Sequence, residues 1–128
     1  MSTRSHIGIA KPDGSLEVVY CHSDGYPSYN GDILLHHYTD VEKIKELISN
    51  GGMSSLEKEI KDCEFFKDRG EEITIYKYNS LEKYLLFAAR DWEIEYFYLF
   101  DEKENKWFMN KNRFSGIKEL TEKEIWRK

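Results

Sequence analysis

The residues best suited to chemistry gather between Tyr20 and Tyr38. This stretch contains three of the four histidines, one of the two cysteines and four of the nine tyrosines. Thiolate and imidazole groups bind zinc and serve as nucleophile and base, whereas tyrosine rings offer stacking faces and hydroxyl donors. The stretch therefore raises three kinds of site: a metal centre, a Cys/His nucleophile and an aromatic binding surface.

A metal centre would combine Cys21 and His22 with the pair His36 and His37, all of which are ligand types that zinc accepts. The spacing, however, matches no zinc finger or knuckle, and ligands that are adjacent in the chain seldom reach the same ion. We therefore expect no metal and no cofactor.

A nucleophilic site would be built on Cys21. Its base would be His6, His36 or His37, with Asp24 orienting the base. No helix is predicted to begin just after Cys21, where it would lower the pKa of the thiol, and no oxyanion site is recognisable. We expect Cys21 to be a small buried residue at the end of a strand. A Cys/His hydrolase or transferase is kept as the last functional alternative, and no catalytic residue is assigned.

An aromatic binding surface fits the loop from His22 to Asn30 best. Asp24-Gly25 is a turn signal, and Pro27 restricts the loop, which lowers the entropy lost on binding. Tyrosines near Arg4 would stack on a nucleotide or form a hot spot for a protein. A concave pocket here would favour a small ligand, whereas a flat acidic and aromatic surface would favour a protein. The residues expected to bind the partner are Arg4, His22, Asp24, Tyr26, Tyr29 and His37.

Length and composition indicate one soluble domain over residues 1–128. Of the 128 residues, 40% are hydrophobic and 34% are charged, which suffices to bury a core without metal or disulfide support. No segment has the apolar length of a signal peptide or a membrane span. We therefore expect no membrane partner and two reduced thiols, Cys21 and Cys63. The net charge of −5 makes nucleic acid an unexpected partner.

Charge is distributed unevenly near the C-terminus. Residues 91–104 contain six acidic side chains and one basic one, whereas residues 106–128 contain seven basic and three acidic side chains. Such a field can steer a charged partner, although a solvated surface without a partner is the commoner explanation.

Hydrophobic patterning predicts strands interspersed with helices. The expected strands cover residues 6–10, 16–21, 73–78, 92–100 and 106–110, and the first two form a hairpin. The expected helices cover residues 32–38, 41–50, 54–62, 80–88 and 122–126, with N-caps at Asp40, Ser54, Asn79 and Thr121 and with Ile125 and Trp126 anchoring the last helix. This order is typical of an α+β domain with a mostly antiparallel sheet of about four to five strands and roughly two to four helices on one face. The strand at 92–100 is apolar on both sides, so we place it centrally or at an oligomer interface.

Several short motifs in the first part of the chain resemble one set of proteins. They are Ser2-Thr-Arg-Ser5 with Ile7-Gly8, Tyr20-Cys-His22, Asp24-Gly-Tyr-Pro27, Leu34-Leu35 with His37-Tyr38, Met53-Ser-Ser-Leu56 and Asp68-Arg-Gly-Glu71. As a set they resemble small uncharacterised proteins carried by bacteriophages and prophages, although Ser23 stands where those proteins carry a bulky aromatic residue. The resemblance brings no assigned chemistry with it.

The resemblance implies a phage-linked origin and a place in the cytoplasm of a bacterial host. Small phage proteins of this kind often bind and disable a host factor. We therefore expect a binding protein that inhibits a host or antiviral-defence (CRISPR-like) protein by direct contact. A small-molecule binder that captures a nucleotide is the leading alternative. A second copy of the chain, forming a homo-oligomer, is kept as a further candidate partner.

Overall fold

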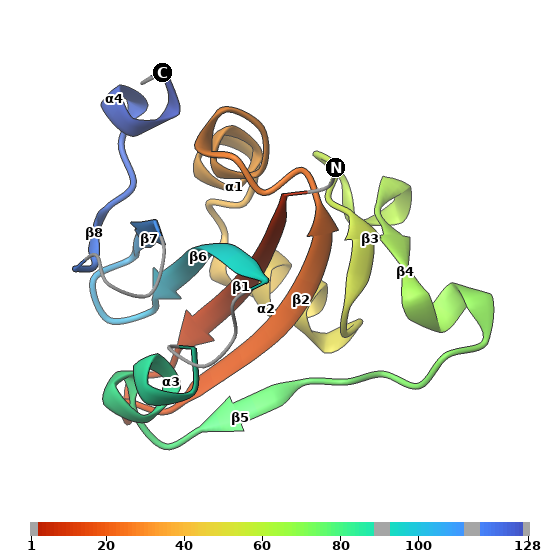
Figure 1. Ribbon diagram of the computed structural model, residues 1–128, viewed down its shortest axis with the longest axis horizontal. Helices are drawn as coiled ribbons and strands as arrows, with labels where there is room; N and C mark the ends of the chain where they lie inside the picture. The colour runs from red at the N-terminus through yellow and green to blue at the C-terminus, as the bar shows by residue number, and fades with distance from the viewer. Residues whose placement is uncertain (1–2, 89–92, 112–115, 127–128) are drawn as a thin grey trace.

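The first hairpin of the chain forms the centre of the sheet (Figure 1). The computed structural model describes residues 3–88, 93–111 and 116–126. In it, β1 (Arg4–Ala10) pairs antiparallel with β2 (Leu16–Ser23), and His6 lies opposite Tyr20. The connecting turn holds Gly14 at a φ of 92°, a conformation that glycine adopts without strain. The predicted hairpin is confirmed.

The sheet is larger than expected and mixed. Within the described residues it has eight strands in the order β4-β3-β2-β1-β6-β7-β8, with β5 also paired to β2. The six strands outside the hairpin are β3 (Met53–Ser55), β4 (Glu64–Phe65), β5 (Tyr76–Tyr78), β6 (Ile94–Asp101), β7 (Lys106–Lys111) and β8 (Lys118–Glu119). The pairs β1–β6 and β2–β3 are parallel. The α+β class is confirmed, but the expected sheet of about four to five mostly antiparallel strands is wrong. The strands β3, β4 and β8 were missed because they are too short to show an alternating pattern in the sequence.

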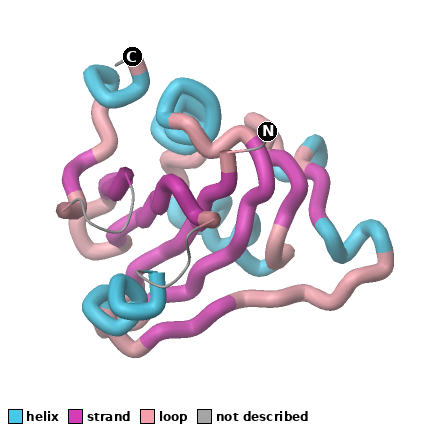
Figure 2. Tube along the Cα trace, viewed as in Figure 1, coloured by secondary structure: helices cyan, strands magenta, loops and turns pink. Residues whose placement is uncertain are grey.

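Helices cover both faces of the sheet, which corrects the expectation of one covered face. Side chains alternate along a strand, so β2 directs Val19 to one face, here termed the first face, and Val18 to the other, the second face. The helices α1 (Asp32–His37) and α2 (Val41–Ser49) pack on the first face, whereas α3 (Leu81–Ala88) packs on the second. In the view of Figure 2, α1 lies above the central strands and α3 lies below them.

The helix predicted between Asp40 and Gly51 is confirmed as α2. The Asp40 carboxylate accepts a hydrogen bond from the main-chain N–H of Glu42 at 3.3 Å, which satisfies one of the donors that a helix start leaves open. Gly51 follows the helix at a φ of 80°, the left-handed conformation that commonly ends a helix. The side chains that α2 buries are Ile44, Leu47 and Ile48.

The helix predicted over residues 54–62 is wrong. Met53 instead pairs with Cys21 of β2 and with Phe65 of β4. Only a 3₁₀ turn at Ile60–Asp62 is helical in this segment. The capping signal at Ser54 is local, and the pairing of the buried Met53 with two strands overrides it.

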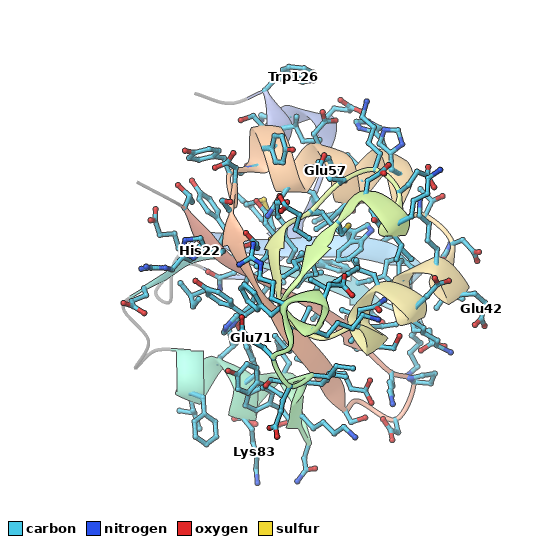
Figure 3. All side chains as sticks on the ribbon, turned by 90° about the vertical axis from the view of Figure 1, so that its right-hand side faces the viewer. His22, Glu42, Glu57, Glu71, Lys83 and Trp126 are labelled. Atoms are coloured by element: carbon cyan, nitrogen blue, oxygen red, sulfur yellow. The ribbon has the colours of Figure 1, made fainter. Side chains whose placement is uncertain are left out.

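The last two helices are present with different details. The Ser80 hydroxyl, rather than the Asn79 side chain, accepts a hydrogen bond at the start of α3, from the main-chain N–H of Lys83 at 3.2 Å. In α4 (Glu122–Ile125), Ile125 is buried as expected. Trp126, the other predicted anchor, is 70% exposed and points away from the body of the molecule (Figure 3).

The strand β6 lies between β1 and β7, which is the central one of the two placements predicted from its apolar pattern. It separates the acidic residues considered above as a field that can steer a partner, because Glu93 and Glu95 are at its start and Glu102 follows its end. Four charged residues of the C-terminal part, Asp91, Arg113, Arg127 and Lys128, and Trp92 of the predicted strand lie outside the described ranges. None of the helices in the described part of the chain has the length and apolar character needed to cross a membrane.

Candidate functional site

The sheet separates the residues expected to bind a partner. Arg4 and His22 adjoin Tyr20, whose ring lies on the second face. Tyr29 packs against the core of the first face, with its hydroxyl 3.3 Å from the carboxylate of Glu57. His37 is exposed at the end of α1, on the side of the first face. The structure therefore brings Arg4 and His22 together but places Tyr29 and His37 elsewhere.

The loop that contains Asp24 and Tyr26 is fixed at its base. The main-chain N–H of Gly25 donates to the carbonyl of Thr3 at 2.8 Å, and the Tyr98 hydroxyl donates to the carbonyl of Gly25 at 2.6 Å. A Cβ atom at Gly25 would lie 2.8 Å from the Thr3 oxygen, so the close approach requires glycine. The Tyr26 side chain remains 41% exposed on this rigid base.

Cys21 is enclosed on the first face. Its Sγ donates to the carbonyl of Ser23 at 3.2 Å and accepts from Nδ2 of Asn30 at 3.4 Å. Burial raises the pKa of the Cys21 thiol to about 12, so the group is protonated at neutral pH. Neither partner is a histidine, and the side chain of His36 is held by Asp32 and Glu122. The arrangement lacks the thiolate and the paired base of a cysteine nucleophile.

Metal-binding side chains do not cluster in the described ranges. No group of three or more histidines, cysteines, aspartates and glutamates in them could hold a metal ion. Both cysteines are free and buried.

A pocket of about 380 Å³ opens on the second face, between the sheet, β5 and α3. Local geometry explains how it forms. His6 and Tyr20 are cross-strand partners in the central hairpin. Tyr76 and Tyr78 are alternate residues of β5 and share one face, and Tyr84 and Phe87 are three residues apart and share one side of α3. The lining residues are His6, Tyr20, Tyr76, Tyr78, Tyr84, Phe87 and Glu93.

The floor of the pocket is fixed by a buried polar contact. Nδ1 of His6 and the hydroxyl oxygen of Tyr84 are hydrogen-bonded at 2.7 Å. The Tyr84 ring also stacks on Phe97 of β6, with the two centroids 4.1 Å apart. These contacts attach α3 to the sheet and hold two of the pocket rings in place.

The rim of the pocket is polar. An ion pair joins Arg4 and Glu93 at 3.5 Å, and the Tyr20 hydroxyl is hydrogen-bonded to Nδ1 of His22 at 2.9 Å. Burial raises the pKa of Tyr20, while the neighbouring Arg4 lowers it to a smaller extent. Arg4 and His22 thus support the pocket through Glu93 and Tyr20 instead of lining it.

The sequence did not identify most of the lining residues as members of one site. Tyr76 with Tyr78 and Tyr84 with Phe87 have the spacings of a strand and a helix, which core residues share. Only the pairing of β5 with β2, and the packing of α3 on the second face, show that these rings enclose a space.

Comparisons with known proteins leave the interpretation of this pocket to its geometry. No family model matches the chain, and neither a curated protein nor a solved structure matches it at a significant level.

Proposed function

We propose that this protein works by binding a small organic molecule in the aromatic pocket of the second face. The observation that carries the proposal is the pocket itself, whose volume is about 380 Å³ and whose lining, among the described residues, is aromatic except for Glu93. Ligand sites are typically concave and mainly apolar, with a few polar groups that orient the ligand. Here the orienting groups are His6 on the floor and Glu93 on the rim.

Capture is favoured over catalysis by the position of the thiols. The pocket is on the second face, whereas Cys21 is buried on the first. A thiol with its pKa raised to about 12 is a poor nucleophile. A nucleotide, the ligand of the leading alternative from the sequence, is one candidate ligand for this pocket.

The proposal is tested by mapping amide shifts in NMR spectra while small aromatic, cationic and nucleotide compounds are added. Shifts should concentrate at the lining residues and should disappear in Phe87→Ala. Leu86→Ala is the matched control, because Leu86 is the adjacent exposed residue of α3 and does not line the pocket. Shifts confined to residues 24–31, or equal losses in both variants, would refute the pocket as the ligand site.

Inhibition of a host or antiviral-defence (CRISPR-like) protein is the second candidate function. It is supported by the exposed Tyr26 on a loop that is fixed by two hydrogen bonds at Gly25, since exposed aromatic residues on rigid loops are common binding hot spots. The resemblance to phage-carried proteins would place such a partner in the bacterial cytoplasm. Capture of one protein from a bacterial lysate by the wild type but not by Tyr26→Ala would support this function.

A further inference from the structure

We infer that the aromatic pocket takes a compact organic cation, namely a substituted ammonium head group. This inference rests on the proposed ligand-binding function and specifies the class of ligand. It is carried by the angles between the rings, by the charge of the lining and by the hydrogen bonds that the hydroxyl groups of two wall residues already make.

The rings form a box instead of a flat slot. The interplanar angle is 75° for His6 and Tyr20, 65° for His6 and Tyr84, and 84° for Tyr78 and Tyr84. It is 40° for His6 and Tyr76 and 49° for Tyr78 and Phe87, so none of these pairs is parallel. A nucleobase stacks best between two nearly parallel rings, whereas steeply inclined rings surround a rounded group. A head group with methyl substituents on nitrogen has this rounded shape.

The nearly parallel ring pairs of this region do not provide a slot for a flat base. Tyr84 stacks on Phe97 at 4.1 Å, and Tyr20 stacks on Phe66 at 6.3 Å. In each pair the second ring lies outside the described lining. Both stacks therefore position the walls of the pocket from behind.

The charge of the lining favours a cation. The faces of aromatic rings carry negative potential and attract ammonium groups. Among the described lining residues, Glu93 supplies a carboxylate and none is a lysine or an arginine. Arg4 pairs with Glu93, but their side chains are 36% and 71% exposed, and an ion pair this exposed is weak enough to be shared with a ligand. The net charge of −5 acts in the same direction.

The hydroxyl groups of two wall residues are already engaged with histidines. Tyr84 is hydrogen-bonded to His6, and Tyr20 is hydrogen-bonded to His22. A nucleobase needs polar partners for its edge, whereas a methylated ammonium group has no such requirement and binds to ring faces.

The test compares choline with its neutral isostere 3,3-dimethyl-1-butanol by calorimetry and NMR on the full chain. Choline should bind at least about tenfold more tightly, because the two molecules have the same shape and differ in charge. Phe87→Leu and Tyr76→Leu keep an apolar contact without a ring, so each should weaken choline about fivefold or more and leave the isostere unchanged. Leu86→Ala should change neither affinity, and Glu93→Gln should weaken choline alone.

The outcomes separate this inference from the proposed function. Equal affinities for choline and its isostere would overturn the inference of a cationic ligand and would mean that the pocket binds an apolar group. Adenosine monophosphate that binds at the lining residues while choline does not would overturn it in favour of a nucleotide. Absence of shifts with every compound, in a protein whose circular dichroism shows it folded, would overturn both. A peptide carrying trimethyllysine that binds more tightly than choline would identify a protein side chain as the source of the head group.

Discussion

Nδ1 of His6 in β1 lies 2.7 Å from the hydroxyl oxygen of Tyr84 in α3, although the two residues are 78 positions apart in the chain. Both side chains are buried. The hydrogen bond joins the centre of the sheet to the helix on its second face, and it is the floor of the aromatic pocket. The stability of this half of the molecule and the shape of its pocket therefore depend on the same contact.

Replacing Tyr84 by Phe should destabilise the protein by about 1–2 kcal/mol, because it removes one partner of a buried hydrogen bond. The free energy of unfolding is measured by denaturation in guanidinium chloride. Tyr76→Phe is the control, since the Tyr76 side chain is 44% exposed and its change should stay within about 0.5 kcal/mol. Equal effects of the two variants would mean that the contact with His6 contributes nothing to stability.

Local signals in the sequence predict a large part of the fold. The hairpin of β1 and β2 follows from alternation and from a turn that contains Gly14. The helix α2 follows from the cap at Asp40 and from its apolar stripe. Each of these features depends on residues a few positions apart, which is the range over which sequence patterns are informative.

The long-range pairings could not be predicted in the same way. Arg4 in β1 pairs in parallel with Ile94 in β6, and Cys21 in β2 pairs in parallel with Met53 in β3. Neither pairing has a local signal, because both depend on how distant segments bury their side chains together. The pocket is missed for the same reason: Tyr76 and Tyr84 belong to a strand and a helix that meet only in the folded chain.

Cys21 should resist modification by a thiol reagent in the folded protein. Burial raises its pKa to about 12, so the reactive thiolate is scarce at pH 8 and the sulfur is inaccessible. Labelling is followed by mass spectrometry, with the protein unfolded in guanidinium chloride as the positive control. Cys21→Ser should leave ligand affinity unchanged, because the residue lies on the face opposite the pocket. Rapid labelling of the folded protein, or loss of function in a folded Cys21→Ser variant, would favour the alternative of a Cys/His hydrolase or transferase.

His36 should make the attachment of α4 depend on pH. Its Nε2 is hydrogen-bonded to Glu122 of α4, and its Nδ1 lies 2.6 Å from the carboxylate of Asp32. The hydrogen bond with Glu122, followed by the one with Asp32, raises the pKa of His36 above its ordinary value of 6.5. A raised pKa in the folded state means that this stabilisation is complete below pH 6.5 and is lost as the pH rises through the higher folded-state value.

Two measurements test this dependence. An NMR titration should place the His36 midpoint above 6.5, and the melting temperature should fall between pH 6 and pH 8 by less in His36→Gln than in the wild type. His37→Gln is the matched control, because Lys43 contacts the main-chain carbonyl of His37 and keeps that contact. The effect should shrink in high salt, since the side chains involved are exposed. Identical pH profiles of the wild type and His36→Gln would show that the contacts of His36 with Glu122 and Asp32 do not contribute to stability.

Substitutions at Tyr26 and at Leu47 should distinguish an effect on binding from an effect on stability. Leu47 is fully buried in α2, so Leu47→Ala should cost about 2–5 kcal/mol of stability. Tyr26 is 41% exposed, and Tyr26→Ala should change stability by less than Leu47→Ala does. If the loop at Tyr26 contacts a partner protein, Tyr26→Ala should weaken that complex by on the order of 2 kcal/mol, as truncation of hot-spot aromatics does.

The affinity of Tyr26→Ala for choline should equal that of the wild type, because Tyr26 does not line the aromatic pocket. Melting temperature, partner affinity and choline affinity are therefore measured on the same preparations. Tyr26→Ala that unfolds as readily as Leu47→Ala would make the loop a structural element. Tyr26→Ala that stays folded and binds the partner normally would move the protein contact away from residues 24–31. The exposed lining residues Tyr76 and Phe87 would then be the next positions to mutate.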